Sequence, residues 1–121
     1  MRLLCADDEP DIRTILEVAL SLAPEIRAEF FPSGIALLER ARLGNIDAIL
    51  LDAMMPEMDG YETCRRLKAD PATAAIPVVF LTARAQRGEQ AGAIEVGAIA
   101  CLVKPFDPLK IASELLAALG R

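Results

Sequence analysis

Four short apolar runs in this chain each end in polar residues that carry reactive chemistry. The runs lead into Asp7-Asp8, Asp52, Thr82 and Lys104. Parallel strands place all their carboxyl ends along one edge of a sheet, and open α/β sheets bind and react at that edge. The pattern therefore predicts both a parallel sheet and the place where separate polar residues converge into one site.

The rest of the chain alternates such runs with segments of helical period. Helices are predicted over Pro10–Leu22, Ile35–Leu43, Tyr61–Ala69, Gly88–Val96 and Pro108–Leu119, and strands over Arg2–Ala6, Ile26–Phe30, Ala48–Leu51, Val78–Leu81 and Ile99–Val103. The strands are continuously apolar, which indicates that helices cover both faces of the sheet. Five βα repeats with right-handed crossovers predict one α/β domain over residues 1–121.

Charge and composition limit the partners. Thirteen basic and 18 acidic residues give a net charge of −5, which disfavours non-specific binding to nucleic acid or anionic membranes. No run approaches a membrane span, and the apolar start is too short for a signal peptide, so we expect a soluble, cytoplasmic protein. The three cysteines form no disulfide framework, and the absence of histidine excludes His-based zinc sites and Ser-His-Asp catalysis.

Three carboxylates are expected to lie close together at the sheet edge. Asp7, Asp8 and Asp52 would converge at neighbouring strand ends. Two unit charges about 4 Å apart repel by ~4 kcal/mol at an effective dielectric constant near 20, so the cluster needs a cation or must partly protonate. An all-oxygen set with positions left for water and phosphate suits Mg²⁺, and the backbone carbonyl of Met54 could add a ligand.

A hydroxyl and an ammonium complete the predicted site. Thr82 and Lys104 are donors for an incoming anion at the same edge. Taken singly, the aspartates or Thr82 could be caps and Lys104 a surface lysine, but their joint placement favours one site. The set fits a carboxylate that accepts a phosphoryl group, with Asp52 as nucleophile and Thr82 and Lys104 on the phosphate oxygens.

The segments around these residues resemble the motifs of receiver domains of two-component response regulators, of the chemotaxis-regulator kind. They occur in order and span essentially the whole chain: Ala6–Pro10, Leu51–Gly60, Leu81–Ala83 and Val103–Phe106. The resemblance implies the flavodoxin-like strand order 2-1-3-4-5 and a cis peptide bond between Lys104 and Pro105. It also implies a phosphoacceptor switch that a sensor histidine kinase or a histidine phosphotransfer protein phosphorylates.

Roles follow from the resemblance by position. Asp52 matches the phosphoacceptor, Asp8 the direct Mg²⁺ ligand and Asp7 the acid that acts largely through water. The Met54 carbonyl matches the backbone ligand, and Thr82 and Lys104 match the residues that contact the phosphoryl group. The side chains of Met54 and Arg84 occupy positions that flank this group.

One position departs from the family pattern. Receiver domains usually carry Tyr or Phe three residues before the lysine, and this chain has Cys101 there. A thiol is too small to act as a rotating ring. We therefore expect the loop after Thr82 and the fourth predicted helix to relay activation to the face formed by that helix, the fifth strand and the fifth helix.

The fifth predicted helix is apolar around most of its circumference, which exceeds the stripe needed to pack one side against a sheet. It could be wedged between its neighbours, or it could form a partner or homodimer surface with Leu109 and Leu116 outermost. The output is equally open at this stage. The chain could act alone through a downstream protein target, or it could be part of a longer regulator with a DNA-binding or enzymatic domain.

Two other functions are compatible with parts of the pattern. Aspartyl-phosphate phosphohydrolases of the haloacid dehalogenase type need a second aspartate two residues after the nucleophile, where this chain has Met54. A nucleotide- or flavin-binding module needs a glycine- or hydroxyl-rich loop after the first strand, where Asp7-Asp8-Glu9 would repel phosphate. We expect a domain that assists its own phosphorylation and dephosphorylation without turning over an external substrate.

Overall fold

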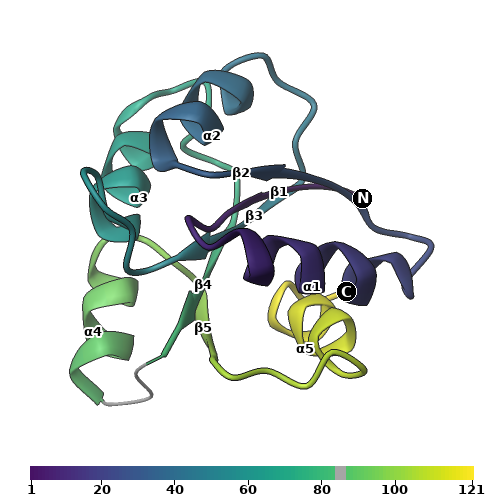
Figure 1. Cartoon of the computed structure of the whole chain (residues 1–121). Coiled ribbons are helices and arrows are strands. Elements are labelled where there is room, and N and C mark those ends of the chain that lie inside the picture. The colour runs from purple at the N-terminus through teal and green to yellow at the C-terminus, as the bar shows by residue number, and fades with distance from the viewer. Residues whose placement is uncertain (84–86) are drawn as a thin grey trace.

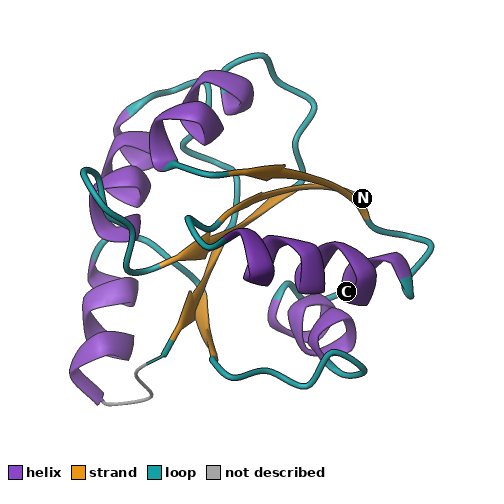
Figure 2. Cartoon of the chain, in the orientation of Figure 1, coloured by secondary structure: helices purple, strands orange, loops and turns teal. Residues whose placement is uncertain are grey.

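Strands and helices alternate along the whole chain (Figures 1 and 2). The computed structural model describes residues 1–83 and 87–121. The strands are β1 (Arg2–Ala6), β2 (Arg27–Phe31), β3 (Ala48–Asp52), β4 (Val78–Thr82) and β5 (Ala100–Val103). The helices are α1 (Pro10–Ser21), α2 (Gly34–Ala41), α3 (Gly60–Ala69), α4 (Arg87–Glu95) and α5 (Ile111–Ala118).

The five strands form one parallel sheet in the order β2-β1-β3-β4-β5. This is the strand order that the resemblance implied, and the predicted α/β class is confirmed. The chain passes from β1 outward to β2 and then returns to β3 on the other side of β1. The crossover direction therefore reverses beside β1, and ligands of open α/β sheets bind next to such a reversal.

The sheet lies between two apolar cores, one on each face, and its central strands are therefore buried on both sides (Figure 1). Helices α2, α3 and α4 cover one face, where the core includes Leu37, Leu67 and Phe80. Helices α1 and α5 cover the other face, where the core includes Leu16 and Ile111. Every residue of β3 and of β4 is buried, as the continuously apolar runs predicted.

Several helix boundaries follow from local capping chemistry. The Ser33 hydroxyl accepts from the Ala36 N–H at 3.2 Å, and the Asp59 carboxylate accepts from the Glu62 N–H at 2.9 Å. Gly97, with φ of 101°, follows the end of α4. These features account for the starts of α2 and α3 and the end of α4.

The start of α1 has no side-chain cap, although the aspartates before it could have served as one. Glu9 is the N-cap residue and makes no capping bond through its side chain. The Asp7 carboxylate instead accepts from the Glu9 backbone N–H at 2.9 Å. The acid that could have been a helix cap is thus turned toward the sheet edge.

The fifth helix starts later than predicted, and one of the residues expected to be outermost on it is partly buried. A turn over residues 108–110 precedes it, and the Asp107 carboxylate accepts from the Leu109 N–H at 2.9 Å. Leu109 is 81% exposed, but Leu116 packs partly against the core of the α1 and α5 face. The expectation that Leu116 lies outermost is therefore wrong, because α5 lies in contact with α1.

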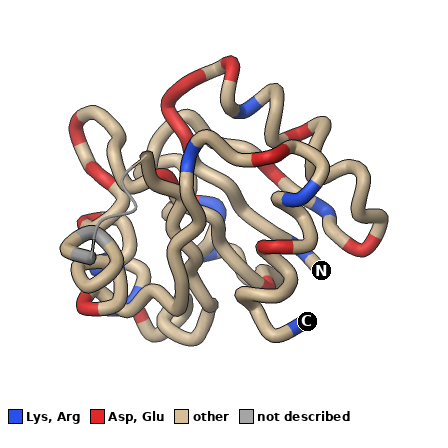
Figure 3. Tube along the Cα trace, turned by 90° about the horizontal axis from the view of Figure 1, so that it is seen from below, with Lys and Arg blue, Asp and Glu red and all other residues tan. Residues whose placement is uncertain are grey.

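The Lys104–Pro105 peptide bond is cis, as the resemblance implied. Basic residues are interspersed among acidic ones in the view of Figure 3, rather than gathered in one patch. Among the described residues, no helix has the length and apolar character needed to cross a membrane.

Candidate functional site

Strand register brings the predicted carboxylates together. Ala6 of β1 pairs with Leu51 of β3, so the next residues on the two strands, Asp7 and Asp52, lie side by side at the carboxyl edge. Asp8 follows on the same turn. Carboxylate oxygens of Asp7, Asp8 and Asp52 all lie within 4.8 Å of one another. Asp7 and Asp52 are buried, and Asp8 is half-buried at the rim.

The same register logic brings the lysine to the cluster. Thr82 of β4 pairs with Val103 of β5, so Lys104 continues β5 beyond the end of β4. Its Nζ donates to Asp7 Oδ2 at 2.8 Å and lies 3.5 Å from Asp52 Oδ1. Burial opposes the charge on Lys104, but the hydrogen bond to Asp7 and the fields of Asp52, Asp7 and Glu9 outweigh it and raise the lysine pKa.

The Asp52 carboxyl is held in an unfavourable environment for an isolated anion. Burial, and then the negative charge of Asp7, raise the pKa of Asp52 from 3.8 to about 6. Lys104 and the Met54 N–H, which donates to Asp52 Oδ1 at 3.3 Å, only partly offset this. The environment therefore favours whatever cation or proton can neutralise the Asp52 carboxylate.

The donor set fits a divalent cation. Three carboxylates and one ammonium leave a formal charge of −2 (3 × −1 and +1) in one small volume. All the candidate ligands are oxygens, and Mg²⁺ prefers one or two carboxylates together with water and phosphate oxygens. Asp7, Asp8 and Asp52 are thus placed to hold such an ion.

The remaining predicted site residues lie at the same edge or outside the described part of the chain. Thr82 is the last residue of β4 and is 2% exposed. The Met54 side chain is 56% exposed, and the role of its carbonyl stays a prediction. Ala83 is exposed beside Thr82. Arg84, which was expected to flank a phosphoryl group, lies outside the described residues.

Two residues that were not predicted as site residues, Arg13 and Gly60, contact the backbone of the aspartates. Arg13 Nη1 donates to the Asp7 backbone carbonyl at 2.8 Å. In the sequence, the one indication of this contact is that Arg13 lies one helical turn after Glu9, close to the end of β1. Gly60 begins α3, and a Cβ there would collide with the Asp52 carbonyl oxygen. Glycine is needed for close backbone approach behind the Asp52 carboxylate.

A cavity of about 460 Å³ opens beside the carboxylate cluster. Its lining is mostly apolar, with Lys104 and Glu9 as the charged residues, and it includes Ile12, Ile15, Ala83 and Phe106. The cavity connects the outer side of α1 with the segment after β5. An incoming group would therefore reach Lys104 along an apolar wall.

Comparison with known proteins assigns this arrangement to a family. A family model described as the response regulator receiver domain matches residues 3–116. The chain belongs to this family. The match confirms the resemblance drawn from the motifs, and with it a phosphoacceptor switch as the function of the fold.

Solved structures support the assignment. The chemotaxis response regulator CheY4 of Vibrio cholerae superposes with a TM-score of 0.89 at 27% identity, over 97% of both chains. The receiver domain of a Pseudomonas aeruginosa sensor histidine kinase superposes with a TM-score of 0.86 at 28% identity, over 99% of this chain and 98% of that one. That second structure was solved with a magnesium ion coordinated in its active-site cleft.

Curated relatives of this receiver domain are longer proteins. The Phosphate regulon transcriptional regulatory protein PhoB of Pseudomonas aeruginosa is 37% identical over 98% of this chain and 52% of that protein. The Response regulator PleD of Caulobacter vibrioides is 40% identical over 91% of this chain and 24% of that protein. The chain thus spans about half of the length of the first relative and about a quarter of the second.

Proposed function

We propose that residues 1–121 act as one receiver domain in which Asp52 accepts a phosphoryl group from a phosphohistidine of a partner protein. The observation that carries the proposal is the position of the Asp52 carboxylate. It lies within 4.8 Å of the Asp7 and Asp8 oxygens and 3.5 Å from Lys104 Nζ. A nucleophile, a divalent-cation site and a phosphate-binding ammonium are thereby combined at one edge.

In the proposed transfer, each residue at the sheet edge has a separate role. An Asp52 carboxylate oxygen bonds to phosphorus while the phosphorus–nitrogen bond to the donor imidazole breaks, and the electron pair stays on the imidazole. Lys104 and Thr82 bind phosphoryl oxygens at the ends of β5 and β4. Asp7, Asp8 and Asp52, with the Met54 carbonyl, would hold Mg²⁺, which supplies positive charge to the phosphoryl oxygens.

The partner class is supported by the surface beside the site. Ile15, Val18 and Leu22 are 42%, 63% and 61% exposed and follow one another at helical spacing along α1. This apolar stripe continues into the cavity of about 460 Å³, which Ile15 also lines. Such a surface suits a helical protein that carries phosphohistidine, a sensor kinase or a phosphotransfer protein, better than a small soluble metabolite.

The output is proposed to pass through the face formed by α4, β5 and α5, where Ile94 and Val103 are 55% and 40% exposed. Phosphorylation adds about −1.5 to −2 charge at Asp52, which would draw in Lys104 and Thr82 and shift a two-state surface. A downstream protein or a further domain of a longer regulator would recognise that surface. A homodimer formed through the fifth-helix face remains a prediction.

The test is incubation with acetyl phosphate and Mg²⁺ followed by intact mass measurement. We expect one phosphoryl adduct that is lost with EDTA and in Asp52→Asn, and that is kept in Asp47→Asn, an exposed aspartate at the opposite edge of the sheet. An adduct of the same yield in Asp52→Asn would refute the assignment. Multiple turnover of a phosphomonoester would instead indicate a phosphohydrolase.

A further inference from the structure

The first turn of α3 is fixed directly to the backbone that follows Asp52. The Gly60 N–H donates to the Ala53 carbonyl at 3.0 Å, and the Gly60 backbone lies against the Asp52 carbonyl. Tyr61 is the next residue. Any displacement of the Asp52–Ala53 backbone is therefore passed on to Tyr61 without an intervening flexible segment.

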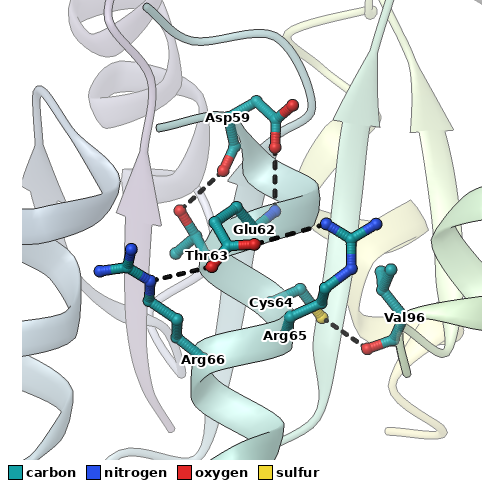
Figure 4. A network of polar contacts seen from close by, with 7 residues as sticks. All are labelled: Asp59, Glu62, Thr63, Cys64, Arg65, Arg66 and Val96. Carbon is teal, nitrogen blue, oxygen red and sulfur yellow. Dashed lines mark hydrogen bonds and ion pairs between the residues drawn. The ribbon is translucent and has the colours of Figure 1, made fainter. Parts of the chain in front are cut away.

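Polar contacts make this turn a rigid unit (Figure 4). The Asp59 carboxylate caps the helix through the Glu62 N–H at 2.9 Å, and the Thr63 hydroxyl donates to the Asp59 carbonyl at 2.8 Å. Glu62 also pairs with Arg66 at 3.0 Å and with Arg65 at 3.5 Å. These contacts hold the turn that carries Tyr61 in one conformation.

The Tyr61 ring touches the strand that carries Thr82. It packs edge to face on Phe80 of β4, with ring centroids 5.1 Å apart and an interplanar angle of 72°. Phe80 and Thr82 are two residues apart and so point to the same face of the sheet. Cys101 pairs with Phe80 across β4 and β5, and its short side chain brings no ring to this place. The aromatic partner of Phe80 comes from α3 instead.

The same ring lies against α4. A Cβ added at Gly92 of α4 would be 3.5 Å from Tyr61 Cε1, which is ordinary contact. The helix is lightly anchored: among its residues with described side chains, only Ala93 is buried, and Ile94 is 55% exposed. Beyond its end, the Cys64 thiol contacts the Val96 carbonyl at 3.4 Å (Figure 4).

Space for a second ring position lies next to this contact. A cavity of about 400 Å³ between α3 and α4 is lined by Tyr61, Arg65, Lys68, Gly92, Glu95 and Val96. The lining combines charged and apolar groups, which suits a phenol ring with its hydroxyl. The Tyr61 ring therefore packs on Phe80 in this structure, and the neighbouring cavity beside α4 offers a second position for it.

We propose that Tyr61 is the positioning residue that couples the state of Asp52 to the position of α4. The inference rests on the proposed phosphorylation of Asp52. When the backbone after Asp52 and the end of β4 shift on phosphorylation, the ring exchanges its contact with Phe80 for the cavity, and α4 moves with it. Transmission runs through α3 and α4 rather than through a side chain of β5.

The chain offers a direct optical test, because Tyr61 is its only tyrosine and it has no tryptophan. Tyrosine fluorescence and its quenching by acrylamide therefore report this ring alone. We expect both to change when beryllofluoride and Mg²⁺, a phosphoryl mimic, bind the wild-type protein. If the mimic binds and the tyrosine signal stays the same, the proposal is overturned. If the wild-type protein does not bind the mimic, the proposed function fails, and this inference with it.

Variants separate a coupling role from a merely structural one. In Tyr61→Leu, we expect the mimic to bind with affinity close to that of the wild type, while amide shift changes across Gly88–Glu95 fall by more than half in NMR spectra. Tyr61→Phe should restore them, because it keeps the ring. Phe30→Leu, which truncates a partly buried ring on the opposite sheet face, should leave them intact. A full α4 response in Tyr61→Leu, or an equal loss in Phe30→Leu, would overturn the proposal.

Discussion

Replacing Asp52 with asparagine should stabilise the protein in the absence of metal. The Asp52 carboxylate lies next to Asp7 in a buried site, and burial together with that charge raises its pKa from 3.8 to about 6. Folding therefore works against its ionisation. Asparagine keeps the shape of the side chain and removes the charge, while the Lys104–Asp7 contact at 2.8 Å stays in place.

The size and sign of the effect follow from proton linkage. A pKa of about 6 in the folded state against 3.8 corresponds to about 3 kcal/mol at 1.36 kcal/mol per unit. Water at the open sheet edge and the Lys104 ammonium screen this, so we expect about 1–2 kcal/mol. Below about pH 3 the carboxyl is protonated in both states, because its pKa is 3.8 in the unfolded chain and higher in the folded one, and it then costs nothing. The penalty grows as pH rises from about 4 to about 6 and is complete above that.

Urea unfolding of the wild type and Asp52→Asn, in EDTA, measures this difference. The variant should be clearly more stable at about pH 7.5, and the difference should shrink toward zero as pH falls through about 4. Saturating Mg²⁺ should then stabilise the wild type more than the variant, because the variant lacks one of the three carboxylates proposed to hold the ion. The control Asp47→Asn, at an exposed aspartate, should show no such gain in stability and should respond to Mg²⁺ as the wild type does. A variant less stable than wild type at about pH 7.5, or a difference independent of pH, would refute the reasoning.

Two backbone positions give further predictions. Glu57 has φ of 67°, in the left-handed region that Glu rarely adopts and Asn adopts more readily. Glu57→Asn should therefore raise the free energy of unfolding by about 0.5–1 kcal/mol. Asn45→Glu, at φ of 62°, should lower it by a similar amount, and opposite signs in chemical denaturation would contradict the account. Gly60→Ala places a Cβ against the Asp52 carbonyl and should cost about 2–3 kcal/mol and weaken Mg²⁺ binding. Gly88→Ala, with open space at its Cβ, should not be destabilising in thermal melts.

Much of the site could be predicted because the ends of apolar runs in the sequence indicate where strands end. The apolar runs before Asp52 and Thr82 indicated two strand termini, and the structure makes each residue the last of its strand. The start of α1 was less predictable. Asp8-Glu9-Pro10 is compatible with a side-chain cap, but the Asp7 carboxylate binds the Glu9 N–H instead. Local sequence does not decide between a cap and a turn when one acid can serve either.

The fifth helix shows a second limit. Its apolar residues surround most of its circumference, and the sequence could not say which of them α1 covers. The structure packs Leu116 partly into the core and leaves Leu109 exposed. Burial of a residue on a nearly uniform helix depends on the neighbour, which is distant in sequence.

The sequence by itself determined the strand–helix alternation, the parallel sheet and the acids, hydroxyl and lysine that end its strands, because these depend on local period and on side-chain chemistry. It also predicted that these residues gather at one edge, and only the tertiary structure decided the individual contacts between them. The pairing of Ala6 with Leu51 sets Asp7 beside Asp52, and the close approach at Gly60 ties α3 to the end of β3. It also brings the Tyr61 ring to Phe80, across from Cys101. Such contacts depend on strand register and helix placement, and these are set by packing between segments far apart in the chain.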